Sequence, residues 1–486
     1  IAELSAPVTQ DSPVCVDMAT AWFYDTTEDW ETYANIAAIA GINVIRDRLT
    51  WEDIEEDRGV FVDYTKYDQT AEIQTDMGLK VLQVFHRKPS WSPEYREAFP
   101  ADLRDLYNFC KEMAIRFKGT VHAWEPWNEG NAWNFGKMTI DELVNLQKAA
   151  YLGFKAGDPN LTVCWNAYSG GFAELHNIGI FKNEGWNYFD TYNGHTYGCI
   201  EGYNQKFRLL RHGAYGKPIW VTEANRFGIP EEWIGSSPWF DLSIFHSSLK
   251  AEFVAQSYAS AVYAGVNRHF LFILGGYGEY PRILRHDFTG RADYVALAAV
   301  GRFMAGAKSI GRIYEENEQE EECHVYAFRA EPDGVKSELI VAWAENSCGW
   351  EGRGDSVAEW PIDEELDVRG VYDYFGRYIG TEIPVQLTGR PIFVVLEPGS
   401  LDGVELEGQT YNTQRPVEPC KVMLQLKMPK STTVAGGSTW TSVNEHVIEP
   451  GVSRAIDIWA YNFSDETVTG QVTAETTNGC TLNPGV

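Results

Sequence analysis

Long apolar runs, paired cysteine motifs and basic residues are all scarce in this chain. No run of eighteen or more apolar residues occurs in the 486 residues, so the sequence predicts no membrane span. The eight cysteines are scattered and none forms a CxxC pair, which argues against a zinc ribbon or a redox motif; we expect most of them to be buried thiols. Only 40 Lys and Arg residues accompany 69 Asp and Glu residues, and the formal net charge of -29 argues against nucleic acid and anionic membranes as partners.

No glycine-rich phosphate loop follows the first predicted strand, which argues against an open doubly wound sheet that binds a nucleotide. Short apolar runs alternate with longer amphipathic segments from residue 14 to 307. The strand-like runs cover residues 14–19, 42–47, 80–86, 120–125, 161–167, 188–194, 217–223 and 268–274. Eight mostly apolar strands, each followed by a helix or a long loop, predict a closed parallel (β/α)8 TIM barrel of the α/β class rather than an open doubly wound sheet.

The pattern changes to strand-like runs parted by "EPDG", "GRGD" and "LTGR" after the barrel, which is typical of antiparallel sheets. The predicted division of the chain is a barrel over 1–309, a β-sandwich over 310–402, a linker over 403–419 and a second β-sandwich module over 420–486. The second module lacks a convincing closing strand, which leaves open a continuation of the native chain past Val486. Because the chain begins with Ile1, a signal segment could have been removed, and we expect a secreted or periplasmic location.

Three predicted strands end on residues that bear chemistry. The fourth strand runs into Glu129 through "VHAWEPWNEGNAW", the sixth carries His195 and Tyr197, and the seventh carries Glu223. Active groups of barrel enzymes lie at the carboxyl ends of the strands. Strands four and seven face each other across an eight-stranded barrel, so we expect Glu129 and Glu223 to converge on one cleft.

Two facing carboxyl groups suit glycoside hydrolysis. One carboxyl protonates the departing oxygen, and the other attacks the anomeric carbon or activates water. This chemistry requires no cofactor and no metal, and no ligand spacing in the sequence indicates a metal site. A carbohydrate is the predicted substrate.

The sequence around each carboxyl predicts which one is the acid. Glu129 lies near Trp124, Trp127 and Trp133, and burial among indoles would raise its pKa and keep it protonated. Glu223 lies near Arg226 and, in a barrel, near Arg46, which would keep it ionised. We therefore predict that Glu129 is the acid and Glu223 the nucleophile.

Four segments, "WEPWNEGN", "KPIWVTEANRFG", "YNGHTYG" and "GINVIRDRLTWEDIEEDRGVF", resemble those of the retaining (β/α)8 glycoside hydrolases of clan A. The pattern is most like family 39, the β-xylosidase and α-iduronidase group, and the resemblance covers most of residues 14–307. It implies an acid/base role for Glu129 and a nucleophile role for Glu223. It also implies that Asn128 binds the sugar 2-hydroxyl, that Arg46 supports the nucleophile and that His195 and Tyr197 orient it.

Two positions depart from the pattern of these relatives. The usual Asn-Glu-Pro reads Asn128-Glu129-Gly130, which alters a loop. The eighth strand runs "FLFILGGYG" where many relatives end on a tryptophan platform, which leaves the sugar unassigned.

Further substrate contacts are predicted at His86, Trp91 and Trp133, with rim hydrogen bonding for the histidine and plain packing for the tryptophans as alternatives. Arg46 and Arg48 could equally form a barrel-rim ion pair. The segment 229–248 could close the cleft into an exo-acting pocket. The predicted function is a retaining, exo-acting β-glycosidase; the alternatives are a non-catalytic carbohydrate-binding barrel and a scaffold or adhesion protein that works through its β-modules.

Overall fold

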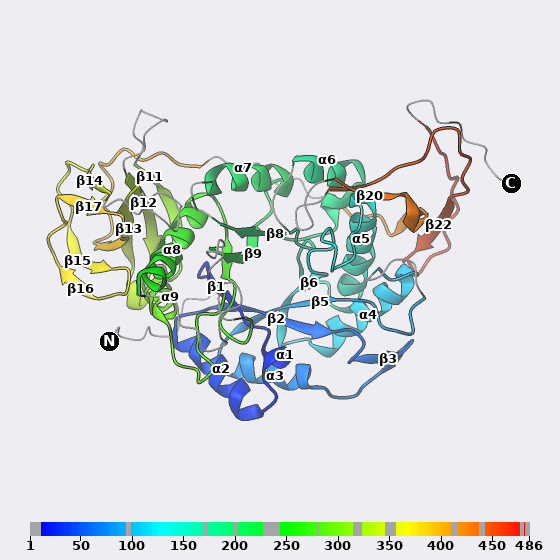
Figure 1. Cartoon of the computed structure of the whole chain (residues 1–486), viewed down its shortest axis with the longest axis horizontal. Helices are drawn as coiled ribbons and strands as arrows, with labels where there is room; N and C mark the ends of the chain where they lie inside the picture. Colours follow the sequence, from blue (N-terminus) through cyan, green and yellow to red (C-terminus); the bar gives the residue numbers. More distant parts are fainter. Residues whose placement is uncertain are drawn as a thin grey trace.

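Eight parallel strands form the central sheet of the molecule (Figure 1), in the order β7-β6-β5-β2-β1-β10-β9-β8. The two edges meet, because Cys164 and Thr191 form a parallel bridge and the Trp165 N–H donates to the Thr191 carbonyl at 2.9 Å. The predicted closed (β/α)8 barrel is therefore confirmed. The strands are β1 (Val14–Asp17), β2 (Val44–Thr50), β5 (Lys80–His86), β6 (Val121–Pro126), β7 (Thr162–Val163), β8 (Tyr192–Tyr197), β9 (Ile219–Asn225) and β10 (Arg268–Leu271).

The computed structural model describes residues 11–93, 99–169, 174–198, 200, 202–226, 244–278, 281–313, 323–345, 356–409, 417–436, 443–476 and 481. Residues 229–243 of the predicted cleft-closing segment lie outside these ranges. No helix in the described ranges combines the length and the apolar character that a membrane crossing requires.

Helices surround the barrel and follow the strands. They are α1 (Thr20–Phe23), α2 (Thr27–Ile39), α3 (Lys66–Asp76), α4 (Leu103–Arg116), α5 (Ile140–Gly157), α6 (Glu174–Lys182), α7 (Tyr203–Ala214), α8 (Ile244–Tyr263) and α9 (Ala292–Phe303). A capping box of Thr139 and Glu142 starts α5 immediately after the loop that follows β6. A short hairpin, β3 (Glu55–Asp57) with β4 (Val60–Phe61), follows β2 and was not among the predicted elements.

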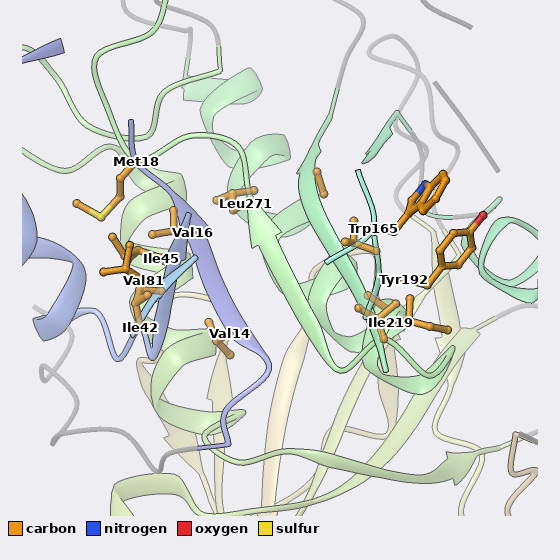
Figure 2. Close-up of a cluster of buried hydrophobic side chains, with 14 of the residues drawn as sticks. Val14, Val16, Met18, Ile42, Ile45, Val81, Trp165, Tyr192, Ile219 and Leu271 are labelled. Carbon is orange, nitrogen blue, oxygen red and sulfur yellow. The ribbon is translucent and has the colours of Figure 1, made fainter. Parts of the chain in front are cut away.

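Alternate residues of each strand face the helices or the barrel interior. Figure 2 shows the helix-facing side, where Val14 and Val16 of β1 lie beside Ile45 of β2, Val81 of β5 and Leu271 of β10. A second apolar cluster belongs to the interior: Cys15, Val44, Leu82, Ala123, Cys164, Trp220 and Phe270. Asp17, Arg46 and Glu125 stand two residues further along β1, β2 and β6, so the interior changes from apolar to charged toward the carboxyl ends.

An antiparallel six-stranded sheet packs beside the barrel, in the order β11-β12-β13-β18-β15-β16, with the pair β14-β17 against it. Every residue of β13 is buried, because one face of the sheet packs on the barrel helices and the other on β14 and β17. This arrangement confirms the predicted β-sandwich. Its strands are β11 (Lys308–Arg312), β12 (Cys323–Ala330), β13 (Ser337–Ala344), β14 (Val357–Glu359), β15 (Val368–Asp373), β16 (Tyr378–Gly380), β17 (Gln386–Thr388) and β18 (Ile392–Leu396).

The C-terminal part lies at the opposite end of the molecule from the sandwich, beside α4 and α5 (Figure 1). Its described residues form two separate antiparallel pairs, β19 (Val422–Lys427) with β22 (Asp457–Asn462) and β20 (Thr433–Gly436) with β21 (Val443–His446). Tyr107 of α4 stacks on Phe463 with ring centroids 4.7 Å apart. A second complete sandwich in this part stays a prediction.

Candidate active site

The loop after β6 presents Glu129 at the carboxyl end of the barrel in an uncommon backbone conformation. Trp127 has φ 79° and Glu129 has φ 47°, both in the left-handed region that L residues rarely adopt. The neighbouring loop supports this turn, because the Glu129 N–H donates to the Ala167 carbonyl at 3.0 Å and Asn128 bridges Ala167. The side chain of Glu129 is buried, with 7% exposure.

A β-bulge brings Glu223 into the interior of the barrel. Trp220 of β9 belongs to the interior cluster, so strict alternation would place Thr222 there next. Instead, Gly194 of β8 pairs with Val221 and His195 pairs with Glu223, which inserts one extra residue on β9. The extra residue turns the carboxylate of Glu223 toward the polar cluster.

Glu223 is surrounded by hydrogen-bond donors. Its Oε1 accepts from Arg46 Nη1 at 2.6 Å and from Arg48 Nη2 at 2.9 Å, while Oε2 accepts from the Tyr197 hydroxyl. Burial acts to raise the pKa of Glu223, but the charges of His195 and the two arginines, with the Tyr197 hydrogen bond, outweigh it and lower the pKa to about 2. Glu223 is therefore ionised at neutral pH.

Arg46 is fully buried and joins four polar side chains. Besides Glu223, its guanidinium donates to Asp17 Oδ2 at 2.8 Å, to Glu125 Oε1 at 2.6 Å and to Asn128 Oδ1 at 2.6 Å. Arg48 shares Asp17 with it, through Nη2 and Oδ2 at 2.7 Å. The sequence left two roles open for these arginines, support of the nucleophile and a barrel-rim ion pair. The structure combines them, because the arginines form a buried ion-pair network that also contacts the predicted nucleophile, Glu223.

His195 lies between the two glutamates. Its Nδ1 is 2.7 Å from Glu129 Oε1 and 3.5 Å from Glu223 Oε2. Burial acts to lower the pKa of His195, but the charge of Glu223 and the hydrogen bond to Glu129 outweigh it and raise the pKa. Among the described residues, Nε2 of His195 has no hydrogen-bond partner.

The three side chains also have the donor types of a metal site. One oxygen each from Glu129 and Glu223 and a nitrogen of His195 lie within 4.8 Å of one another. Two guanidinium groups already pair with Glu223, however, and this positive charge disfavours a further cation there.

His86 lies at the same end of the barrel, on the last position of β5. Its ring contacts Trp22 and Phe135 edge-on, with centroids 5.2 and 5.1 Å away. Burial, together with the charges of Arg48, Arg87 and Arg46, lowers the pKa of His86 to about 3, so the ring is neutral.

Trp91 and Trp133, the other two predicted substrate contacts, lie outside the cluster of polar side chains around Glu223. Trp91 packs on Trp51 and under Arg58, and its Nε1 donates to the Glu55 carbonyl at 2.9 Å. Trp133 is 57% exposed to solvent. The structure therefore gathers Glu129, Glu223, Arg46, Asn128, His195 and Tyr197, with His86 nearby, but not the two tryptophans.

The predicted shell of indoles around Glu129 is wrong. Trp124 points to the helix side of β6, where its ring contacts Phe117 and Phe154, and Trp133 is exposed. The immediate neighbour of the Glu129 carboxyl is instead the imidazole of His195. Arg226, expected beside Glu223, is absent from the donors that contact that carboxylate.

Asp17 is the site residue that the sequence reading missed. A carboxylate closing the apolar run "VCVDM", at the carboxyl end of the first strand, was the available signal. Glu125 of β6 accepts from Asn193 Nδ2 at 2.6 Å as well as from Arg46, so it holds the arginine in place.

Fold and site together define a (β/α)8 barrel with two facing carboxyl groups at the carboxyl ends of its strands, and solved glycoside hydrolases share this fold. A family 39 glycoside hydrolase from Bacteroides cellulosilyticus WH2 is 18% identical, with a TM-score of 0.59 over 80% of this chain and 81% of that chain. A family 30 endoxylanase from Clostridium papyrosolvens C71 is 13% identical, with a TM-score of 0.55 over 82% of this chain and 99% of that one. A family 39 β-xylosidase from Caulobacter crescentus is 14% identical, with a TM-score of 0.52 over 81% and 98%.

These similarities confirm the predicted resemblance at the level of the fold. Neither a family model nor a curated protein matches the chain.

Proposed function

We propose that this protein is a retaining glycoside hydrolase that cleaves β-type glycosidic bonds by double displacement. The observation that carries the proposal is the closeness of the two carboxyl groups, because one oxygen of Glu129 and one oxygen of Glu223 lie within 4.8 Å of each other. Retaining enzymes have carboxyl groups about 5–5.5 Å apart, whereas inverting enzymes leave room for a water at roughly 6.5–9.5 Å. The solved hydrolases with this fold support a carbohydrate as the substrate.

Glu223 is the nucleophile in this proposal. Its ionised carboxylate attacks the anomeric carbon and forms a glycosyl-enzyme ester. Arg46, Arg48 and Tyr197 fix the carboxylate by contacting both of its oxygens. Because these donors pre-orient the nucleophile, little reorganisation is needed when it reacts.

Glu129 is the acid in the first step and the base in the second. It protonates the departing oxygen and later removes a proton from the water that releases the sugar. Its Oε1 is paired with His195 at 2.7 Å, so we assign the transferred proton to Oε2. Asn128 accepts from Arg46 at its Oδ1, which turns its amide NH2 away from the arginine and toward a sugar hydroxyl in this proposal.

Exo action and a secreted or periplasmic location stay predictions. Exo action depends on the segment 229–248, of which the described part is only the beginning of α8 at Ile244. The non-catalytic carbohydrate-binding barrel is the alternative, and the paired, hydrogen-bonded carboxyl groups count against it.

The test is hydrolysis of a panel of aryl glycosides and oligosaccharides by the wild type, by Glu223→Gln and by the exposed control Glu31→Gln. We expect turnover by the wild type and the control, and a loss of at least about 10⁴-fold in kcat for Glu223→Gln. Nuclear magnetic resonance of the first sugar released should show the β anomer. An α anomer formed first would exclude double displacement, and no turnover of any glycoside by the wild type would favour the binding protein.

A further inference from the structure

The loop that carries Glu129 is closed on itself near its base. We refer to residues 129–138 as the acid/base loop; the Met138 N–H donates to the Gly130 carbonyl at 2.8 Å and so joins its two ends. Its first residue, Glu129, has the left-handed φ of 47°, which is unfavourable for an L residue. Such a conformation persists only where the surroundings enforce it.

The C-terminal hairpin β20–β21 supplies part of that enforcement. Asn444 of β21 is 3% exposed, and its Nδ2 donates to the Asn131 carbonyl and to the Met138 carbonyl, both at 2.9 Å. One amide group from more than 300 residues away thus spans the two ends of the acid/base loop. The orientation of this amide is determined, because only its NH2 can face two carbonyl acceptors.

The barrel holds the same loop from the other side. The Ser169 N–H donates to Asn131 Oδ1 at 3.0 Å, and Asn131 Nδ2 donates to the Ser169 carbonyl at 3.3 Å. Asn131 is therefore fixed by its side chain to the loop after β7 and by its carbonyl to the hairpin. It stands two residues after Glu129, so its position sets the direction in which the chain leaves the acid.

His446 extends the contact to the start of α5. It stands two residues after Asn444 and therefore points to the same side of β21, with Nε2 at 3.2 Å from Thr139 Oγ1 and 3.6 Å from Asp141 Oδ2. Burial acts to raise the pKa of Asp141, but hydrogen bonds from His446 and Thr139 outweigh it and lower the pKa below its ordinary value. Glu445, between the two residues, is exposed.

We infer that the β20–β21 hairpin fixes the acid/base loop and that Asn444 is a positioning residue for Glu129. The inference rests on the proposed function, because it concerns the placement of the acid. Without the two amide hydrogen bonds, the loop loses its link between Asn131 and Met138. The Glu129 carboxyl then departs from the geometry that proton transfer to a leaving group requires.

The test compares the full chain with Asn444→Ala, Asn444→Asp and Glu445→Ala. Asn444→Asp keeps the shape of the side chain but replaces the donor amide by an acceptor, whereas Glu445→Ala changes the exposed neighbour on the same strand. Hydrogen exchange of the amides in residues 129–138 is the first measurement. Both Asn444 variants should speed exchange at least about tenfold, the equivalent of one lost hydrogen bond, and Glu445→Ala should leave it unchanged.

The second measurement is kcat/KM for aryl glycosides with good and poor leaving groups. Both Asn444 variants should lose about tenfold on unsubstituted phenyl glycosides and less than about twofold on dinitrophenyl glycosides, which need no acid. If Asn444→Ala does not fold, Asn444→Gln takes its place in the comparison. It retains the amide donor, so its loss of kcat/KM on phenyl glycosides should be smaller than that of Asn444→Asp.

The outcomes separate this inference from the proposed function. Unchanged exchange in residues 129–138, or equal losses on both kinds of leaving group, overturns the positioning role. A wild type without glycosidase activity overturns the proposed function, whereas the exchange measurement still decides whether the hairpin fixes the loop.

Discussion

Arg46 Nη1 lies 2.6 Å from Glu223 Oε1 and, at the same time, 2.8 Å from Asp17 Oδ2. One nitrogen thus links Asp17 at the end of β1 to Glu223 on β9. Taking such charges out of water is costly, and the cost is offset only when each charge is paired and hydrogen-bonded. The network meets this condition, because both nitrogens at the end of the guanidinium contact carboxylates.

Removal of the Arg46 guanidinium should therefore destabilise the protein strongly. Arg46→Met leaves Asp17 and Glu125 without this buried partner, and we expect the free energy of unfolding to fall by about 3–5 kcal/mol. Arg104→Met is the matched control, since Arg104 pairs with Asp102 on the surface at 69% exposure and should change stability by less than about 1 kcal/mol. Urea unfolding measures both, and equal losses would contradict the role of burial.

Tyr197→Phe should raise the pKa of Glu223. The Tyr197 hydroxyl donates to Glu223 Oε2 and so favours the ionised form, which contributes to a pKa of about 2. Without it we expect the acid limb of the kcat/KM profile to move to higher pH by about one unit, because a hydrogen bond to a charge is worth roughly 1.5 kcal/mol.

The control for this variant is Tyr64→Phe, which removes a hydroxyl that donates to Glu72 at 2.7 Å on the surface. Its profile should coincide with that of the wild type. Circular dichroism at each pH separates protonation of Glu223 from unfolding. An acid limb that stays in place in Tyr197→Phe would show that the hydroxyl does not favour the ionised form.

The sequence predicted the convergence of Glu129 and Glu223 because barrel topology alone determines which strand ends face each other. The direction of a side chain at the end of a strand is harder to predict. The bulge that turns Glu223 inward depends on the register of β8 against β9, which no local pattern encodes. The Asn444 contact joins segments more than 300 residues apart and likewise has no local signal.

The indole shell illustrates a different kind of failure. Ala123 faces the barrel interior, and Glu125 reaches Arg46 there, so alternation requires Trp124 between them to face the helices. The period of the strand was available in the sequence. Proximity along a strand does not predict proximity in space, because neighbouring residues point to opposite faces.

Gly130 follows Glu129 at a position where the structure leaves no room for a side chain. A Cβ at this position would lie 2.6 Å from Leu143 Cδ2 and 3.3 Å from Met138 Sδ. Gly130→Ala should lower the free energy of unfolding by about 1–3 kcal/mol through overpacking. Leu143→Ala removes the side chain that the new methyl group would meet. The double variant Gly130→Ala/Leu143→Ala should therefore lose less free energy of unfolding than the sum of the two single variants.

The control is Gly403→Ala, because a Cβ at Gly403 would meet no atom within 4 Å. Urea unfolding of the single and double variants measures the coupling between positions 130 and 143. Additive losses would contradict the steric explanation.

Buried His176 should make the stability of the protein depend on pH. The His176 ring stacks on Tyr168 with centroids 3.8 Å apart and an interplanar angle of 5°, and burial lowers its pKa to about 4. An unfolded histidine has a pKa of about 6.5, so the unfolded chain binds the proton more readily. The stability from the neutral ring is therefore fully present above about pH 6.5 and is lost as the pH falls toward 4.

His176→Phe keeps an aromatic ring for the stack but cannot bind a proton. Between pH 6 and 4, its free energy of unfolding should fall less steeply than that of the wild type, by up to about 1.4 kcal/mol per pH unit. Part of the dependence of stability on pH should remain in the variant, because the pKa values of buried His86 and His269 are also lowered, to about 3. Above pH 7 the two curves should run parallel; parallel curves at acid pH as well would show that His176 takes up its proton in the folded state.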